Sequence, residues 1–493
     1  MGLKIYNSFT QKKEVFNPLN QGKIGIYVCG ITAYDRCHIG HARSAVVFDA
    51  VVRYLRFLGY KVTFVRNFTD IDDKIIKRAN EEGISCKELS EREIRHFYED
   101  MDALGVLRAD IEPKATEHIK EIIELVQQLI DKGFAYVADG DVLFSVRKFK
   151  SYGALSKRDI KQLRAGARIA VDKKKKDPMD FTLWKASKPG EPSWQSPWGE
   201  GRPGWHIECS AMSMKYLGAT LDIHGGGLDL IFPHHENERA QSEAATGKEF
   251  VRFWMHNGFV TIKGDKMSKS LGNFITIKDL LEEYTPEALR LFLLSKHYRS
   301  PLDFSKEALL EAESAIMRLY TCVATAKELM NKKIKKQRPI SDEAKNAENL
   351  IAGLKEKFLS AMDDDFNTAK ALGYLFEGVK ALNKVIDSYQ KKPSLLYIPI
   401  LEKGVQNLTE LSNILGLVKK DPQQFIYERN IAFLNKQGLT IKELDEVIEK
   451  RNKARAKKDW KQADKIRNDL LQKGIILEDT PEGTKWRVEI KQN

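Results

Sequence analysis

An apolar stretch, a turn, an amphipathic stretch and a second apolar stretch follow one another near the start of the chain. The first, KIGIYVCG at residues 23–30, is rich in β-branched residues and is typical of a buried strand. At residues 41–60 apolar side chains recur at helical spacing, and Gly59 is a typical stop signal for a helix. Residues 61–68, KVTFVRNF, predict the next strand. A strand, a helix and a strand over this length predict a parallel crossover, and therefore an α/β domain.

A chain of 493 residues is too long for one hydrophobic core, so we expect several domains. Residues 1–134 begin the α/β domain, residues 135–204 form an insertion that is partly loop, and sheet signals return within residues 205–285. Helical patterns run through residues 286–420, and residues 421–493 predict a basic helix pair followed by a small hairpin. The predicted fold is an α/β domain split by an insertion, then a helical bundle and a small mixed α/β C-terminal domain.

Membrane and disulfide-stabilised proteins are disfavoured by the composition. No uninterrupted apolar stretch is long enough to cross a bilayer, and the N-terminal segment MGLKIYNSFTQKK lacks the apolar core of a secretory signal. We therefore expect a cytoplasmic protein. An odd number of cysteines argues against a disulfide framework and leaves metal ligation or burial. The cysteines are Cys29, Cys37, Cys86, Cys209 and Cys322.

The formal net charge is +12, and much of the excess lies near the C-terminus. Residues 450–467, KRNKARAKKDWKQADKIR, hold nine basic residues and two acidic ones. Such a segment suits a polyanionic partner such as RNA, although a solvated charged face has the same composition.

The motif CGITAYDRCHIGHAR lies between a predicted strand end and a predicted helix start. A helix N-terminus at that edge of an α/β sheet offers free N–H groups to a phosphate. His38 and His41 flank this position and could donate hydrogen bonds to an α-phosphate, while Gly40 lets a nucleotide approach closely. A histidine pair alone would more often be ordinary surface or core.

The motif KMSKS begins at Lys266, after a predicted strand and turn. Lys266 and Lys269, with Ser268 between them, could close over the β- and γ-phosphates of ATP, although a lone pair of lysines usually belongs to a solvated loop. An HIGH motif followed far downstream by KMSKS resembles the class I aminoacyl-tRNA synthetases. The resemblance implies a Rossmann-like catalytic domain and an ATP site that uses Mg²⁺. Its ATP-binding residues would be His38, Gly40, His41, Lys266, Ser268 and Lys269, with the histidines and lysines catalytic.

The stretches GWHIECSAM and LDIHGGGLDLIFPHHENERAQSE supply further metal-ligand side chains. His234 and Glu238 stand four residues apart after Pro233, and so face one side of a helix. Two thiolates, an imidazole and a carboxylate are acceptable zinc ligands. The chemistry alone leaves open Cys29 or Cys37 as a ligand beside Cys209, and His234, His224 or His235 as the imidazole.

The GGGxDLxFPHHENE stretch resembles the cysteinyl-tRNA synthetase family. The resemblance implies that zinc is bound by Cys29, Cys209, His234 and Glu238. It also implies that this zinc binds the thiolate of the substrate. Serine differs from cysteine by one atom, so shape alone discriminates poorly, whereas a soft thiolate binds zinc far better than a hydroxyl does. No separate editing domain is then needed.

The same resemblance places Trp205 as a wall of the cysteine pocket, with Gly30, Thr69 and His224 lining it. From the residues alone, Trp205 is as well explained as a core anchor. The acidic turn in NFTDIDDKI either orders the site or caps the next helix, and capping at Asp70 is the favoured interpretation.

The implied partners are tRNA(Cys), L-cysteine and ATP, in a monomeric enzyme. The basic C-terminal helix and Trp460 would contact the anticodon stem, with a solvated face as the alternative. Two rival functions share the same motifs. One is a cysteine ligase that passes activated cysteine to a small amine, and the other is a non-catalytic RNA-binding protein with a structural zinc.

Overall fold

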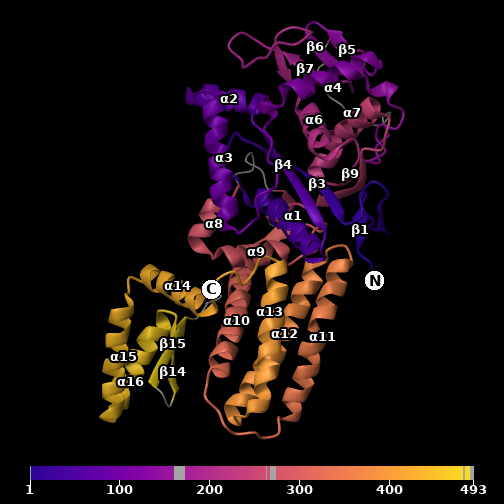
Figure 1. The fold of residues 1–493 in the computed structure, drawn as a ribbon. Helices are drawn as coiled ribbons and strands as arrows, with labels where there is room; N and C mark the ends of the chain where they lie inside the picture. The colour runs from indigo at the N-terminus through magenta and orange to yellow at the C-terminus, as the bar shows by residue number, and fades with distance from the viewer. Residues whose placement is uncertain (1, 160–172, 263, 267–273, 481–482, 489–493) are drawn as a thin grey trace. The chain divides into compact units, whose positions relative to one another are not determined.

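The computed structural model describes residues 2–159, 173–262, 264–266, 274–480 and 483–488 (Figure 1). The chain forms two compact units. The first comprises Met1–Glu282, Leu293–Asp303 and Leu359–Ala371, and the second comprises Glu283–Phe292, Phe304–Phe358 and Leu372–Asn493.

A four-stranded parallel sheet lies at the centre of the first unit. Its strand order is β10-β9-β3-β4, with β3 at Lys23–Thr32, β4 at Lys61–Thr69, β9 at Leu221–Gly227 and β10 at Val251–Asn257. Helix α1, Ile39–Phe57, connects β3 to β4 and ends just before Gly59, whose φ of 90° suits glycine. The predicted crossover is therefore confirmed. The sheet combines strands from before and after the insertion.

Further helices of the described part of this unit connect and flank the strands. They are α2 (Asp73–Glu82), α3 (Cys86–Ala103), α4 (Ile119–Asp131), α6 (Trp205–Leu217) and α7 (Glu236–Thr246). The predicted cap at Asp70 is wrong. Asp72 caps α2 by accepting a hydrogen bond from the backbone N–H of Lys74 at 2.8 Å, because Asp72 is the extended residue just before the helix. Asp70 instead accepts a hydrogen bond from the backbone N–H of Thr116 at 3.0 Å.

We expected the insertion to be partly loop, but it contains a four-stranded antiparallel sheet. Its strands are β5 (Ala135–Ala138), β6 (Asp141–Phe144), β7 (Phe181–Ala186) and β8 (Gly201–Pro203), in that order. Phe144, Leu183 and Trp184 join a buried core with residues of α4, α6 and α7. Smaller sheets pair β1 (Lys4–Asn7) with β2 (Lys12–Val15), and β11 (Val260–Ile262) with β12 (Asp265–Lys266) and β13 (Leu302–Phe304).

Helices make up most of the second unit, and α10, α12 and α13 run side by side (Figure 1). The helices around the unit boundaries and within the bundle are α8 (Ile277–Glu283), α9 (Pro286–Leu294), α10 (Lys306–Met330), α11 (Asp342–Asp363), α12 (Thr368–Lys391), α13 (Ile398–Ile414) and α14 (Pro422–Lys436). The predicted helix pair and hairpin are confirmed as α15 (Ile441–Ala456), α16 (Trp460–Gln472), β14 (Ile475–Thr480) and β15 (Gly483–Val488). The bounds of the five predicted segments of the chain stay predictions.

Within the described part of the chain, no helix is both long enough and apolar enough to cross a membrane.

Candidate functional site

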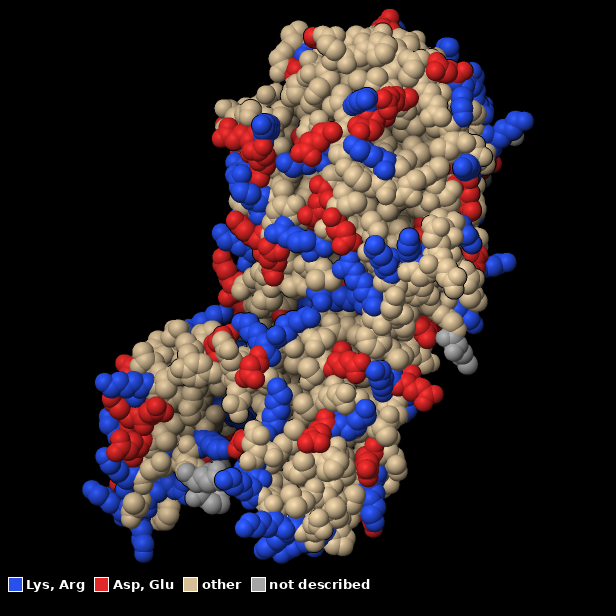
Figure 2. Space-filling model, viewed as in Figure 1, with Lys and Arg blue, Asp and Glu red and all other residues tan. Residues whose placement is uncertain are grey.

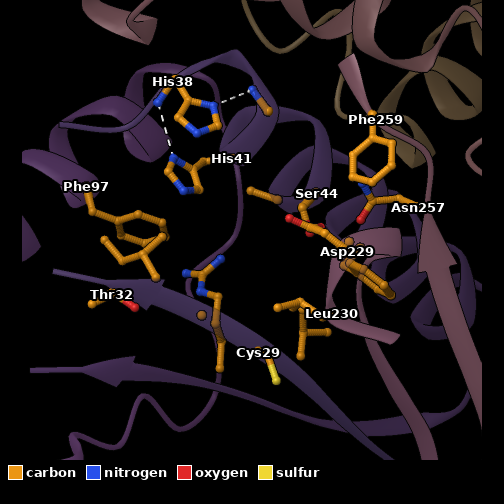
Figure 3. Close-up of a pocket in the computed structure, with 18 of the residues that line it drawn as sticks. Cys29, Thr32, His38, His41, Ser44, Phe97, Asp229, Leu230, Asn257 and Phe259 are labelled. Atoms are coloured by element: carbon orange, nitrogen blue, oxygen red, sulfur yellow. Dashed lines mark hydrogen bonds between the residues drawn. The ribbon is translucent and has the colours of Figure 1, made fainter. Parts of the chain in front are cut away.

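A cavity of about 350 Å³ opens at the C-terminal ends of β3, β9 and β10 (Figure 3). This is the edge at which ligands bind in open α/β sheets. The predicted site residues that line the cavity are Cys29, Gly30, His38, Gly40, His41 and Trp205. Thr69, His224, Cys209, His234 and Glu238 do not line the cavity but are buried.

His38 is both a cavity residue and the N-cap of α1. Its Nδ1 accepts a hydrogen bond from the backbone N–H of Gly40 at 3.0 Å. Its own backbone N–H donates to Nδ1 of His41 at 3.2 Å, which completes a capping box. The two rings lie 3.9 Å apart, centroid to centroid. Local helix capping therefore determines the orientation of both imidazoles.

His41 is held neutral by its surroundings. Burial, together with the neighbouring His38, lowers the pKa of His41 from 6.5 to about 3. Because its Nδ1 is an acceptor, the proton of the neutral ring is carried by Nε2. His41 can thus donate one hydrogen bond from Nε2 without carrying a charge.

Only the start of the KMSKS motif is described. Lys266 lies in β12, where its backbone pairs with Thr261 of β11. Ser268 and Lys269 lie outside the described residues.

Four potential metal ligands converge behind the cavity. The Cys29 Sγ lies 3.7 Å from Cys209 Sγ, 3.5 Å from His234 Nε2 and 3.4 Å from Glu238 Oε1. His234 Nε2 and Glu238 Oε1 are 2.9 Å apart. Cys29 comes from the end of β3, Cys209 from α6, and the other two from α7 and the turn before it. The structure thus brings together the four side chains that the family resemblance implies.

The distances between the sulfurs and from sulfur to nitrogen fit zinc. Tetrahedral zinc–sulfur bonds of about 2.3 Å place two sulfurs about 3.8 Å apart, and a sulfur and a nitrogen about 3.6 Å apart, close to the observed 3.7 and 3.5 Å. The 2.9 Å between His234 Nε2 and Glu238 Oε1 is shorter than the about 3.3 Å expected for two ligands of one zinc ion, so these two side chains would separate slightly on binding. A second set with ligand atoms within 4.8 Å of one another contains Cys29, His224, His235 and Glu238. Cys37 belongs to neither set among the described residues, and the set with two cysteines is the softer one.

The charges of this buried cluster are strongly coupled. The hydrogen bond from Cys29 lowers the pKa of Cys209 to about 6 despite burial. Burial lowers the pKa of His234, but Glu238 and Cys209 raise it more, to about 10. Burial raises the pKa of Glu238, but His224 and His234 outweigh burial and hold it well below its usual value. At neutral pH the cluster therefore contains a thiolate, a carboxylate and a protonated His234, whose proton a divalent cation would replace.

Further histidines support the cluster. His224 Nε2 lies 2.8 Å from Glu238 Oε2, and His206 Nδ1 lies 2.8 Å from His234 Nδ1. His235 Nδ1 lies 2.8 Å from His256 Nε2. Such contacts orient metal ligands. We did not predict His206 or His256, although His206 follows Trp205 in the GWHIECSAM stretch.

The predicted cysteine-pocket residues divide into two groups. Trp205 is 38% exposed and lines the cavity, so it is not a core anchor. At Gly30 a Cβ would lie 1.6 Å from the backbone oxygen of Asn67, so only glycine fits. Thr69 donates to Glu208 Oε2 at 2.9 Å and supports the site from behind, as His224 does.

Polar cavity residues that we did not predict lie opposite Phe97 and Thr32 in Figure 3. They are Ser44, Asp229 and Asn257. Asn257 is the last residue of β10 and Asp229 lies two residues after the end of β9, so their place at strand ends was the available signal.

Comparison with known proteins identifies the family. The family model described as tRNA synthetases class I (C) catalytic domain matches residues 15–314. The cysteine–tRNA ligase of Thermodesulfovibrio yellowstonii is 56% identical over 493 residues, covering 99% of this chain and 100% of the relative. This chain belongs to the cysteine–tRNA ligase family. The predicted enzyme class, a ligase that forms aminoacyl-tRNA, is thereby confirmed.

Other matches agree with this family. The cysteine–tRNA ligase of Desulfotalea psychrophila is 54% identical, covering 99% of each chain. A DALR domain model matches residues 357–419, and a model described as cysteinyl-tRNA ligase anticodon binding domain matches residues 426–487. Methionyl-tRNA synthetase of Mycobacterium tuberculosis, in complex with methionyl-adenylate, has a TM-score of 0.58 at 17% identity, covering 80% of this chain and 90% of that chain. This likeness confirms the predicted class I fold.

Proposed function

We propose that this cysteine–tRNA ligase activates cysteine with ATP to cysteinyl-adenylate and transfers it to the 3′-terminal ribose of tRNA(Cys), with zinc selecting the thiolate. One observation carries the proposal. The capped histidine turn and the cluster that ends at Cys29 border a single cavity at the strand ends. An α-phosphate at the turn would lie within the same cavity as a cysteine whose side chain points toward the cluster.

The two histidines of the turn would stabilise the charge that develops on the α-phosphate. Because Nδ1 of His38 and Nδ1 of His41 both accept backbone hydrogen bonds, Nε2 is the nitrogen of each ring that carries a proton and can donate. Donors that are oriented before the reaction stabilise a developing charge without reorganisation. We expect no proton transfer by His41, because its low pKa keeps it neutral.

Cys29, Cys209, His234 and Glu238 would hold the zinc ion. When bound, zinc supplies a soft Lewis acid that prefers the cysteine thiolate to the serine hydroxyl. Trp205 and Gly30 would line the cysteine pocket on the cavity side. Behind the pocket, Thr69 donates a hydrogen bond to Glu208, and His224 hydrogen-bonds to Glu238.

Lys266, Ser268 and Lys269 would bind the β- and γ-phosphates together with Mg²⁺, as in the class I motif that they resemble. Positioning and charge stabilisation would therefore account for adenylate formation. The tRNA ribose hydroxyl, expected to be the 2′-OH, would then attack the adenylate carbonyl and release AMP.

The C-terminal helices would bind the tRNA. Lysine side chains on α15 and α16 are exposed, and Figure 2 shows basic side chains along these helices with acidic ones among them. Trp460 is 57% exposed at the start of α16, where a base could stack on it. We further propose a cytoplasmic monomer.

Amino-acid-dependent ATP–pyrophosphate exchange tests the proposal, comparing cysteine with serine in zinc-loaded and zinc-stripped enzyme. We expect cysteine, but not serine, to support exchange. This exchange should be lost when zinc is removed and restored when zinc is added back. No exchange with cysteine in folded, zinc-loaded protein would overturn the activation step. Equal exchange in stripped enzyme would overturn the role of zinc, and exchange without charging of tRNA(Cys) would favour a small amine as the acceptor.

A further inference from the structure

Tyr27 lies beneath the metal cluster in a row of three rings that crosses the sheet. It precedes Cys29 by two residues on β3, whose register with β4 is irregular between Val28 and Ile31. In the sheet register Tyr27 pairs with His224, and His224 pairs with Trp254. Tyr27 and His224 meet edge to face with centroids 5.2 Å apart, and His224 stacks on Trp254 at 4.8 Å. Strand register therefore determines the position of the Tyr27 ring.

The hydroxyl of Tyr27 is buried beside the cysteines. Tyr27 is 0% exposed, and its oxygen has no hydrogen-bond partner among the described residues. Buried hydroxyls nearly always have such a partner. Tyr27 and Cys209 pack in one buried cluster, and Cys29 packs against that cluster. The hydroxyl is therefore a buried donor in a cluster that contains two cysteine side chains.

We propose that the Tyr27 hydroxyl donates a hydrogen bond to the Cys209 thiolate when zinc is bound, and that Tyr27 is a positioning residue of the metal centre. This inference rests on the zinc site of the proposed function. A phenylalanine would fill the same space and make the same contact with His224. Unlike phenylalanine, tyrosine has a hydroxyl that needs a hydrogen-bond acceptor. Metal binding deprotonates the cysteine ligands, and the resulting thiolate can be this acceptor.

The expected effect of this hydrogen bond is electronic as well as structural. A donor withdraws negative charge from the sulfur, so that the thiolate donates less to the metal, and it fixes the direction of the sulfur lone pairs. The metal then retains more of its capacity to accept a further thiolate. Tyr27 would in this way tune the preference of the centre for cysteine while lying outside the cavity lining.

The test uses Co²⁺ in place of zinc in the full chain, because cobalt–thiolate charge-transfer absorption reports charge on the sulfur. Tyr27→Phe is compared with wild type and with Tyr54→Phe. Tyr54 is also 0% exposed, but its hydroxyl donates to Asp363 Oδ1 at 2.7 Å, away from the cluster. We expect Tyr27→Phe alone to shift the absorption to longer wavelength. In the zinc forms, we expect Tyr27→Phe alone to lower metal affinity by about tenfold in chelator competition, because the lost orientation of the Cys209 sulfur outweighs its stronger donation to the metal.

The outcomes separate this inference from the proposed function. A wild-type cobalt form without thiolate absorption would overturn the zinc site and the role of Tyr27 together. Normal wild-type absorption that is unchanged in Tyr27→Phe would overturn the role of Tyr27 alone. A Tyr27→Phe variant with unchanged metal affinity and only a raised KM for cysteine would also overturn the role of Tyr27, because the hydroxyl would then contact the substrate. If Tyr27→Phe fails to fold, a fluorinated tyrosine at this position, a stronger donor, should shift the absorption to shorter wavelength, and no shift would overturn the proposal.

Discussion

The indole ring of Trp205 stacks on the imidazole of His234, with centroids 4.2 Å apart and planes inclined by 26°. His234 is buried, whereas Trp205 is partly exposed and lines the cavity. The indole therefore separates the metal cluster from the cavity on this side. A bound cysteine that reaches the cluster would contact the edge or face of this ring.

Replacing Trp205 by alanine should weaken cysteine binding selectively. Loss of this apolar wall should raise the KM for cysteine about tenfold, which corresponds to about 1.4 kcal/mol, and leave the KM for ATP nearly unchanged. ATP–pyrophosphate exchange measures both constants. Tyr427→Ala removes an aromatic side chain that is 57% exposed on α14 and should change neither. Equal increases in both KM values for Trp205→Ala would contradict its assignment to the cysteine pocket.

Two variants of His38 should separate its structural role from its chemical one. In His38→Asn the amide oxygen can still accept from the Gly40 N–H and cap α1, but the Nε2 donor is lost. We expect normal thermal stability and a fall of about a hundredfold in the exchange rate. In His38→Ala both functions are lost, so about 1 kcal/mol of stability should be lost as well. Normal exchange by His38→Asn would show that His38 is only a cap.

The sequence predicts much of this site because its chemistry lies in local motifs. The alternation of apolar strands with a helical repeat identified β3, α1 and β4, and HIGH lies at the junction where a helix N-terminus must meet the sheet edge. The choice of Cys29 over Cys37 could not be made from spacing, since Cys29 lies near the end of β3 and Cys37 follows the same strand. It depends on the end of β3 facing Cys209 of α6, a contact 180 residues apart in sequence.

The residues that were missed depend on strand register and on packing between distant elements. Tyr27, which was missed, meets the predicted His224 because β3 pairs with β9 in one of several possible registers, and no local pattern specifies which. His206 meets His234 only because α6 packs against α7. The cap was assigned to Asp70, not Asp72, because neighbouring acidic residues in one turn differ only in backbone conformation.

The neutral state of His41 predicts a pH-dependent contribution to stability. Its pKa is about 3 in the folded chain and near 6.5 when unfolded, so between these values the unfolded chain binds the extra proton. The contribution of neutral His41 is therefore complete above pH 6.5. It is lost as the pH falls toward 3, by about 1.4 kcal/mol per pH unit. Urea unfolding at about pH 7 and pH 5 should show a smaller loss in His41→Gln than in wild type. Equal losses would mean that His41 is not buried neutral.

Lysines of the C-terminal helix pair should contribute to tRNA binding through phosphate contacts. Lys457 lies exposed at the C-terminal end of α15, in the most basic segment of the chain. If it neutralises one phosphate, Lys457→Ala should lower the slope of log affinity against log salt by about 0.7 to 0.9, because one fewer counterion is released. Lys87→Ala, which removes an 84% exposed lysine from α3, is the matched control and should leave the slope unchanged. Filter binding of tRNA(Cys) over a series of salt concentrations gives both slopes. A lower affinity for Lys457→Ala with an unchanged slope would show that the side chain acts through the fold of the C-terminal helices, because a phosphate contact cannot be lost without its counterion.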